Sequence, residues 1–439
     1  MNTVALVAAH FVPSNLTAVH RSRLWTYHLD DFGWEPIVVT THWDYYEEPT
    51  VRDLFDLVPD DLEVVRTEAL PTEPVRVVGD IGIRAFYWHY QALCDLAERG
   101  RIDFIHITIP SFYSALLGRL IHRRYGIPYG IDYIDPWVHD FPVFDVPLGH
   151  LKSWASTRLA ETLEPWAVRD VSLITGISPS YYEGVLDRNP HLKDGAVTAA
   201  MPYGGDRRDH EALASSPRPL FLWDEGDGDD TFRFLYAGAM LPRAYPVLNV
   251  FLDALERLRD RAPELYDRVE FHFVGTGSSP NDPEGHNVLP LAEERGLRDV
   301  VHEHPHRISY LDVLNHLQDA DGALVIGSTE RHYSPSKTYQ AVLSKTPIWA
   351  MLHEASSATK VVRDSRTGVV VSFPDDDLPP PSNVAASLES FVTDPGYHPE
   401  DVRWELFDDY SARETTRTLA QALDEAHARA SDAPVRATE

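Results

Sequence analysis

Short apolar runs alternate with amphipathic stretches along the first half of the chain. Apolar runs of this length, bounded by turn residues, indicate buried strands, whereas apolar residues that recur every three to four positions indicate helices. Strands that alternate with helices are typical of βαβ units and so of a parallel sheet. The predicted strands are 4–9, 35–41, 104–108, 129–133, 172–176 and 197–201, and the predicted helices are 19–32, 83–99, 111–125, 151–169 and 180–188.

The same alternation restarts after an acidic, glycine-bearing stretch, DEGDGDD, at 224–230. Its aspartates lack the closing glutamate of a calcium loop, so residues 206–231 are predicted to form a solvated linker rather than a metal site. Predicted strands follow at 232–237, 269–274, 300–304, 322–326, 347–350 and 368–372, with helices at 246–259, 290–295, 310–320, 336–343 and 385–391 and a final amphipathic helix at 411–430.

These patterns predict an α/β protein with two doubly wound, Rossmann-like domains. The first domain would cover 1–205, the linker 206–231 and the second domain 232–400, while 401–439 would carry the last helix. Ligands of such sheets bind at the carboxyl ends of the strands. With two halves facing each other, we expect the site in the cleft between them.

Length and composition narrow the class of protein. With 439 residues, 43% hydrophobic and 24% charged, the chain has the balance of a folded globular protein. No apolar run approaches the roughly 18 residues of a membrane-spanning helix, and the N-terminus lacks the pattern of a signal peptide. A single cysteine, Cys94, excludes a disulfide framework and a cysteine-based zinc site. We therefore expect a cytoplasmic protein.

The net charge of −29 is the strongest compositional signal. It argues against a nucleic-acid partner, because sequence-independent binding of nucleic acid needs a basic surface. Apart from Lys152, Lys193, Lys337, Lys345 and Lys360, every basic residue is arginine. An acidic excess with scarce lysine favours a halophilic protein from a salt-rich cytoplasm, where salt screens self-repulsion. A GC-rich genome is the alternative explanation.

The segment ERHYSPSKTYQAVLSKTP, at 330–347, carries the strongest chemical signal. A predicted strand ends near Gly327 and a predicted helix begins near Ser336, and the unpaired N–H groups of a helix start suit a phosphate. Lys337 would lie in the first turn, where a cation opposes the helix dipole. A bound anion beside Lys337 would explain its position, and a solvated surface lysine is the alternative.

Two glycine turns follow predicted strands in the same half. YAGAMLPR, at 236–243, places Gly238 where a ligand can approach the backbone and Arg243 where a guanidinium can contact a phosphate. An ordinary connection between a strand and a helix is the alternative. FHFVGTGS, at 271–278, lacks the G-x-G-x-x-G dinucleotide fingerprint, so we expect it only to shape the wall of the cleft.

In the first half, DYIDPWVHD at 132–140 follows a predicted strand. We expect Asp135 either to face the cleft or to cap the turn before the following proline. Trp137 would serve either as an apolar platform for a sugar ring or as a packing anchor. Thr108 lies near the carboxyl end of a neighbouring predicted strand, and His106, which shares its face, is expected to form a hydrogen bond in the core.

The 21 histidines raise the question of a metal site. The densest group is His302, His304 and His306, which have the alternate spacing of a strand, with Pro305 inside the group. We expect no metal here or elsewhere in the chain. The sequence also contains no G-x-S-x-G elbow, Walker loop or H-E-x-x-H motif.

Four elements, in their order, give the chain a resemblance over nearly its whole length to the family-4 retaining glycosyltransferases of GT-B fold. HFVPSNLTAVHRSRLWTYHLDDFGWEPIVVT is similar to that family's opening strand, loop, helix and second strand. DYIDPWV resembles its DFRDPW element, and YAGAMLPR resembles the start of its donor-binding half. SPSKTYQAVLSKTPIWAML resembles its KLFEYLAAGKPILA element. The resemblance also implies that the last helix crosses back onto the first domain.

The resemblance implies that the second domain binds a nucleotide-sugar donor and that the first domain binds an acceptor. Arg243 and Lys337 match the basic pair that holds the diphosphate, and Ser336 with neighbouring amides would assist. The family's ribose-binding glutamate falls on Gln340, and the first glutamate of its paired motif falls near His332. Glutamine has one acceptor oxygen where a carboxylate has two, so the first of these departures changes how a ribose could be bound.

Two further positions depart from the family pattern. Ile134 stands where the DFRDPW element has its arginine, and residues 14–18 lack the glycine pair that is common in the first loop. Both departures lie in the half that the resemblance assigns to the acceptor.

On this resemblance, the expected activity is transfer of a sugar to a glycan, glycolipid or other hydroxyl acceptor with retention, in surface polysaccharide or glycoconjugate synthesis and without a cofactor. Arg243 and Lys337 would stabilise the leaving diphosphate, and Asp135 would orient the acceptor or the sugar. A catalytically degenerate subunit that acts as a binding or scaffold partner and a sugar-nucleotide epimerase are the alternatives.

The acceptor side also raises the question of a membrane, because acceptors in this family are often lipid-linked. LLGRLIHRRY, at 116–125, is the segment best suited to peripheral contact with the cytoplasmic face of a membrane, through Arg119, Arg123 and Arg124. Packing of its leucine face on the sheet is the alternative.

Overall fold

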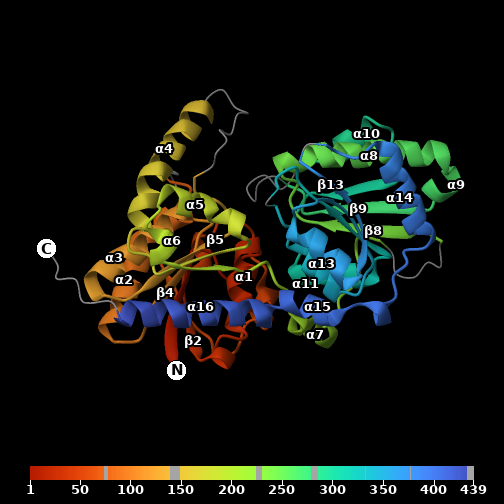
Figure 1. The fold of residues 1–439 in the computed structure, drawn as a ribbon. Coiled ribbons are helices and arrows are strands. Elements are labelled where there is room, and N and C mark those ends of the chain that lie inside the picture. The colour runs from red at the N-terminus through yellow and green to blue at the C-terminus, as the bar shows by residue number, and fades with distance from the viewer. Residues whose placement is uncertain are drawn as a thin grey trace. The chain divides into compact units, whose positions relative to one another are not determined.

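The chain forms two compact α/β units (Figure 1). The first unit contains Met1–Tyr46, Val58–Tyr203 and Ala412–Glu439, and the second contains Glu47–Leu57 and Gly204–Ser411. Each unit therefore includes a segment that is remote in sequence from its main stretch. The computed structural model describes residues 1–73, 78–138, 149–223, 230–277, 285–331, 333–375 and 377–432.

A parallel sheet of seven strands forms the centre of the first unit. The strands are β1 (Asn2–Ala8), β2 (Trp34–Thr41), β3 (Glu63–Thr67), β4 (Phe104–Thr108), β5 (Tyr129–Tyr133), β6 (Leu173–Gly176) and β7 (Val197–Ala200). Their order is β3-β2-β1-β4-β5-β6-β7, so the chain first winds outwards from β1 and then from β4 in the opposite direction. The carboxyl ends of β1 and β4 thus mark the switch point of a doubly wound sheet, the usual place for a ligand.

Helices from both ends of the sequence complete the first unit. α2 packs against β2 and β3, whereas α3 packs against β4 and β5, and α16 packs against β6, β7 and α1. The indole of Trp34 on β2 donates a hydrogen bond of 2.9 Å to Asp424 on α16. These helices and their neighbours are α1 (Thr17–Thr26), α2 (Ile81–Glu98), α3 (Ala115–Tyr125), α4 (Gly149–Ala167), α5 (Glu183–Arg188), α6 (Leu192–Gly195) and α16 (Ala412–Asp432).

The second unit repeats the architecture with a parallel sheet of six strands. The strands are β8 (Phe232–Ala237), β9 (Val269–Val274), β10 (Val301–His304), β11 (Gly322–Ile326), β12 (Ile348–His353) and β13 (Gly368–Phe373). Their order, β10-β9-β8-β11-β12-β13, places the switch point between β8 and β11. The helices are α7 (Arg207–Ser215), α8 (Tyr245–Arg261), α9 (Pro263–Tyr266), α10 (Leu289–Glu293), α11 (Tyr310–Asp319), α12 (Lys337–Leu343), α13 (Ser357–Ser365), α14 (Pro381–Thr393) and α15 (Trp404–Phe407).

Burial explains why the strands appear in the sequence as apolar runs. β4, β5, β11 and β12 are buried at every residue, because helices cover both faces of the central strands of a parallel sheet. In the second unit, Phe234, Phe271 and Trp349 from three strands form a core with Phe251 of α8 and Phe391 of α14. The predicted fold class, an α/β protein with two doubly wound sheets, is confirmed.

The stretch 206–231, predicted to be a linker, differs from that prediction in its first part. It contains α7, which belongs to the second unit and packs against α11. Asp206 caps this helix, because its carboxylate accepts a hydrogen bond of 2.9 Å from the N–H of Arg208. The acidic residues 224–229 lie outside the described residues.

The edge strand β3 is missing from the sequence prediction for a physical reason. Of its five residues only Thr67 is buried, so no continuous apolar run marks the strand. A half-exposed edge strand has a weaker signal than a central strand that is covered on both faces.

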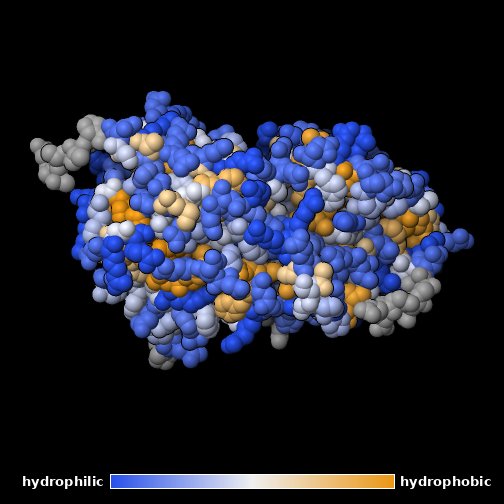
Figure 2. Space-filling view, turned by 90° about the horizontal axis from the view of Figure 1, so that it is seen from below, coloured by the Kyte–Doolittle hydropathy of each residue, from blue (hydrophilic) through white to orange (hydrophobic). Residues whose placement is uncertain are grey.

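The surface agrees with the acidic composition. Hydrophilic side chains dominate the face that Figure 2 shows, and apolar side chains lie there in separate patches. Among the described residues, no helix combines the length and the hydropathy needed to cross a membrane.

Candidate active site

The switch point of the second sheet brings most of the predicted donor-side residues into one region. β8 leads into Gly238 and β11 leads into Gly327, and the chain turns after each strand. The N–H of Thr329, after β11, donates to the carbonyl oxygen of Arg243, after β8, at 3.1 Å. This hydrogen bond holds the two turns together at the carboxyl end of the sheet.

Gly238 and Lys337 are in direct contact at this place. Gly238 has a φ of +140°, in the region that favours glycine, and a Cβ on it would lie 3.1 Å from Nζ of Lys337 and 3.2 Å from its Cε. Any other residue would therefore meet both backbone strain and the lysine side chain. The glycine turn that the sequence predicts for a ligand is here the surface against which the lysine lies.

The ammonium group of Lys337 is buried, and it has no hydrogen-bond acceptor among the described residues. Its Nζ lies 3.4 Å from the centre of the Tyr236 ring. Such a cation–π contact recovers only part of the hydration that a buried charge loses. Burial consequently lowers the pKa of Lys337 well below its ordinary value. An anion that enters here would supply the missing acceptor and favour the charged amine.

Tyr236 is a site residue that the sequence analysis missed. It is the fifth residue of β8, it is buried, and its hydroxyl donates to the carbonyl of Ala239 at 3.2 Å. Its position at the start of YAGAMLPR, just before the glycine turn, was the available signal. The sequence could not show that its ring would lie beneath the lysine.

The other predicted donor-side residues differ in how they are placed. Arg243 lies in a 3-10 turn, Pro242–Ala244, that precedes α8, and its side chain is exposed. Ser336 precedes α12 without a capping hydrogen bond from its side chain. His332 lies outside the described residues.

Gln340 lies one turn further along α12 than Lys337, and so on the same side of the helix. Its Nε2 would lie 3.4 Å from a Cβ on Gly205, and its side chain neighbours His210, whose pKa is lowered by burial. The Oε1 of Gln340 is buried without a partner among the described residues. A carboxylate in this buried position would carry a larger desolvation cost than an amide, which gives a physical reason for glutamine here.

On the predicted acceptor side, Asp135 and Trp137 have different surroundings. Asp135 is exposed two residues beyond β5. Burial first, and then the charge of Asp135, raise the pKa of Tyr203 well above its usual range, so the two side chains are neighbours. Trp137 is only 4% exposed and stacks on Phe112 with ring centres 6.0 Å apart. Of the two roles expected for Trp137, the structure shows the packing anchor and not an accessible platform.

Thr108 is buried at the end of β4, next to a polar cluster that the sequence analysis missed. Nε of Arg21 contacts Oδ2 of Asp132 at 2.7 Å, and Nη2 contacts Oδ1 at 2.9 Å. The hydroxyl of Thr175 also donates to Oδ1 of Asp132, at 2.7 Å. Burial alone would raise the pKa of Asp132, but the charge and hydrogen bonds of Arg21 lower it below its usual range.

His106 lies at the edge of this polar cluster, as the expected core histidine. It is fully buried, and its Nε2 lies 3.4 Å from the hydroxyl of Thr175. Burial lowers the pKa of His106 to about 4, so the imidazole is neutral at physiological pH. The predicted hydrogen bond in the core is thus confirmed, with Thr175 as the partner.

The basic segment 116–125 forms most of α3 and is engaged within the first unit. Arg119 is buried and forms an ion pair with Asp170 at 2.9 Å. Arg124 forms a longer ion pair, of 3.4 Å, with Glu98. Since α3 packs against β4 and β5, the alternative of a packing helix accounts for this segment.

Comparison with known protein families finds a similarity within the first unit. Residues 18–197 match the family described as glycosyl transferase 4-like domain. The matched segment is less than half of the chain and is similar to a glycosyl transferase 4-like domain. It contains β2 to β6 and both Asp132 and Asp135. Among curated protein sequences, none matches the chain.

Solved structures of GT-B fold superpose on nearly the whole chain. A sucrose-phosphate synthase from Thermosynechococcus elongatus has a TM-score of 0.63 at 15% identity, over 96% of this chain and 98% of that chain. An alpha,alpha-trehalose 6-phosphate synthase from Burkholderia multivorans has a TM-score of 0.62 at 12% identity, over 99% of both chains. A protein described as trehalose-6-phosphate from E. coli, bound with UDP-2-fluoro glucose, has a TM-score of 0.62 at 11% identity, over 97% of this chain and 99% of that chain. Likeness at such low identity establishes the fold and not the substrate.

Proposed function

We propose that the chain is a cytoplasmic glycosyltransferase that moves a sugar from a nucleoside-diphosphate sugar to a hydroxyl acceptor with retention, in the synthesis of a surface polysaccharide or glycoconjugate. The glycosyl transferase 4-like domain at 18–197 and the GT-B fold support the class of reaction. The observation that carries the proposal is the buried ammonium of Lys337, which has no acceptor among the described residues at the switch point of the second sheet.

The chemistry of the donor explains why a buried cation would be useful here. When the glycosidic bond to the diphosphate breaks, negative charge develops on the leaving phosphate oxygens. A cation already fixed in a dry site stabilises that charge, and removing one such group commonly costs about 2.7–4 kcal/mol of transition-state stabilisation. Lys337 would supply this charge from the end of the sheet, while exposed Arg243 would close on the diphosphate by a two-point contact.

The remaining residues receive supporting roles in the proposal. Gly238 leaves room for the lysine and for the approaching phosphate, and Ser336 would offer its hydroxyl to a phosphate oxygen. Asp135, exposed beyond β5, is our candidate for orienting the acceptor hydroxyl. Because Lys337 and Arg243 would carry the compensating charge, the proposal assigns no metal or cofactor to the transfer step.

A direct test is calorimetric titration of the protein, in high potassium chloride, with UDP, GDP, ADP and TDP. UDP is the first candidate because a structure with the same fold is described as bound with UDP-2-fluoro glucose. We expect selective binding of one diphosphate, and a loss of roughly a hundredfold or more in affinity or turnover in Lys337→Ala. Lys360→Ala is the matched control, since Lys360 is an exposed lysine of the same unit. Equal behaviour of Lys337→Ala and the wild type would overturn the role of Lys337.

A degenerate subunit is the second candidate, and Gln340 favours it. The amide lies beside Gly205 and His210 and offers one acceptor oxygen where the glutamate implied by the resemblance has two. Slow hydrolysis of the bound donor distinguishes the two functions, because an active transferase releases sugar to water whereas a scaffold does not. Conversion of the donor sugar without release would indicate an epimerase instead.

A further inference from the structure

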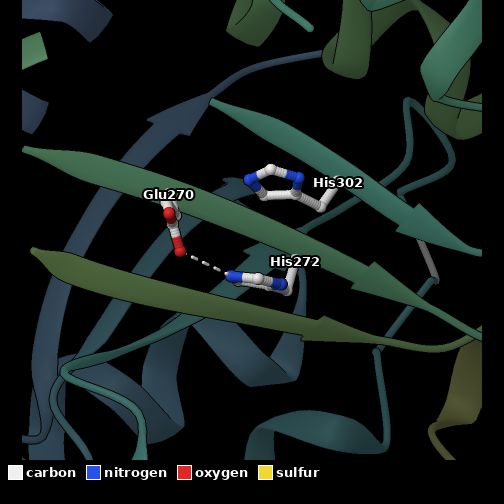
Figure 3. A group of neighbouring side chains, drawn as sticks. All are labelled: Glu270, His272 and His302. Atoms are coloured by element: carbon white, nitrogen blue, oxygen red, sulfur yellow. Dashed lines mark hydrogen bonds and ion pairs between the residues drawn. The ribbon is translucent and has the colours of Figure 1, made fainter. Parts of the chain in front are cut away.

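A group of two histidines and one glutamate lies on neighbouring strands at one edge of the second sheet (Figure 3). Glu270 and His272 are on β9, and His302 is on the edge strand β10. His272 and His302 are direct partners in the parallel register. Their rings stack with centres 4.8 Å apart and an angle of 26° between the planes. The register therefore aligns both imidazoles on the same face of the sheet.

The three side chains offer the donor atoms of a transition-metal site. One ligand atom from each residue lies within 4.8 Å of the other two. Oε2 of Glu270 and Nε2 of His272 are 3.1 Å apart, which is close to the roughly 3.4 Å that separates two ligands at 2.1 Å from a tetrahedral ion. Two imidazoles with one carboxylate are a common donor set for zinc and related divalent ions.

The surroundings supply a second observation that points to a ligand. Nε2 of His302 is buried, and it has no hydrogen-bond partner within the described ranges. A buried polar atom without a partner is costly, and a metal ion would satisfy it. Binding of one ion would draw the His302 ligand atom from within 4.8 Å of the other two towards the 3.1 Å that separates Glu270 and His272.

Among the described residues, the groups that face the cluster from neighbouring elements do not complete the ligand set. Nε of Arg233 on β8 lies 3.6 Å from Oε2 of Glu270 and competes with a metal for that oxygen. The Trp223 ring lies 4.8 Å from the ring of His272 and covers it. His316 on α11 is already engaged, because its Nε2 accepts hydrogen bonds from two backbone N–H groups. The fourth position of a bound ion is thus left for water.

The cluster is separate from the candidate active site. Tyr236 pairs with Phe273, the residue after His272, and their rings are in contact. Because side chains alternate along a strand, His272 lies on the face of the sheet opposite to Tyr236 and its lysine. An ion at the cluster would join the edge strand β10 to β9 and would not touch a donor sugar bound at Lys337.

We propose that Glu270, His272 and His302 bind one divalent transition-metal ion, with zinc as the first candidate, and that the ion clamps β10 to β9. This differs from the sequence expectation, which assigned no metal and considered His302 only with His304 and His306. Strand pairing places His302 beside Glu270 and His272 of β9, which are distant in sequence, rather than beside His304 and His306. The proposal does not depend on the proposed function.

The first experiment counts and measures the bound ion. The full chain, produced without a histidine tag and stripped with a chelator, is titrated with zinc chloride by calorimetry, and bound zinc is then measured by mass spectrometry. We expect one tight equivalent in the wild type and a loss of about tenfold or more in affinity in His302→Asn. His306→Asn is the matched control, because His306 is exposed on the same segment.

Two outcomes of this titration would overturn the proposal. One is a wild type with no saturable zinc site, and the other is equal loss of binding in His302→Asn and His306→Asn. Zinc should also raise the midpoint of thermal unfolding of the wild type and leave that of His302→Asn unchanged, because a ligand that binds the folded state stabilises it.

A second experiment needs no ligand variant and so does not depend on the folding of one. Cu²⁺ quenches the fluorescence of a nearby indole, and Trp223 lies against His272. We expect one equivalent of Cu²⁺ to quench part of the tryptophan emission of the wild type and to have a much smaller effect on Trp223→Phe. If the quenching is the same in both proteins, the ion is bound elsewhere and the proposed site is wrong.

Discussion

Each of the two sheets has a buried cationic side chain near its switch point, and the two cations have opposite surroundings. In the first unit, Arg21 is 3% exposed, and its guanidinium meets both carboxylate oxygens of Asp132. In the second unit, Nζ of Lys337 is buried against Tyr236 and has no hydrogen-bond acceptor in the part of the chain that the structure describes. The first charge is balanced by the fold itself, whereas the second is not.

The difference separates a structural ion pair from a binding group. Arg21 also donates to the carbonyl oxygens of Met201, at 2.7 Å, and Pro202, at 3.3 Å, so it fixes the chain after β7. The N–H groups of Arg21 are engaged in hydrogen bonds within the first unit, and a ligand would have to displace those hydrogen bonds. Within the described residues, Lys337 gives up hydration without gaining a counter-charge, and unbalanced buried groups of this kind cluster at functional sites.

The largest change in the free energy of unfolding is expected when the ion pair between Arg21 and Asp132 is broken. Asp132→Asn should lower the free energy of unfolding by about 3–5 kcal/mol, because Arg21 remains buried without its counter-charge. Urea denaturation measures the change. Asp187→Asn is the control, since Asp187 forms an exposed ion pair with Lys193 at 2.8 Å, and pairs of this kind contribute little. Equal loss of stability in both variants would contradict the structural role of the Arg21–Asp132 pair.

Methionine in place of each of the two cations should change the free energy of unfolding in opposite directions. Arg21→Met leaves Asp132 buried and unpaired and should destabilise the chain by about 3–5 kcal/mol. Lys337→Met removes an unsatisfied buried group and should raise the free energy of unfolding by about 1 kcal/mol, while it abolishes most of the nucleotide binding. Chemical denaturation of both variants is the measurement. If Lys337→Met is destabilised as strongly as Arg21→Met, the lysine is structural and the comparison fails.

How much of this contrast the sequence can predict depends on the range of the interactions. Local features of strand–turn–helix segments can be predicted from the sequence. They include Gly238 at the end of β8, Arg243 after it and Lys337 at the start of α12. The order of strands and helices is predicted for the same reason, because buried parallel strands are apolar at nearly every position.

The remaining features depend on contacts between segments that are distant in sequence. Arg21 and Asp132 are 111 residues apart, and no local pattern shows that an arginine in the first helix is buried. His302 is similarly paired by strand register with His272 rather than with the histidines beside it in the sequence. Trp137 illustrates the same limit, because only the neighbouring Phe112 decides between packing anchor and platform.

The third test uses pH to detect the unpaired charge of Lys337. Burial lowers the pKa of this amine well below its ordinary value of 10.5. Between the two pKa values the unfolded chain therefore binds more protons than the folded chain, so the contribution of Lys337 to stability rises with pH. The advantage of Lys337→Met over the wild type should shrink as the pH rises towards 10.5. Denaturation of both proteins over this range measures the difference, and a constant difference would show that the amine stays charged in the fold.

The smallest effect is expected from placing at position 340 the glutamate that the resemblance implies there. Gln340 lies beside Gly205 and His210, so the carboxylate of Gln340→Glu should raise the pKa of His210, which burial now lowers. Nucleotide affinity should change by less than about 0.5 kcal/mol, the usual scale for a substitution outside a binding contact. Proton NMR of His210 and calorimetry with the bound nucleotide are the two measurements.

Gln318→Glu is the matched control for that variant, because Nε2 of Gln318 lies 3.0 Å from Nδ1 of the same histidine. Both substitutions place a carboxylate beside His210, but only position 340 is one at which the resemblance implies a contact with the ribose. If the two variants behave alike, residue 340 belongs to the packing between α7 and α12, and the second unit holds its donor through the diphosphate. A tenfold or larger gain of affinity in Gln340→Glu alone would instead place this side chain on the ribose and restore the role that the resemblance implies.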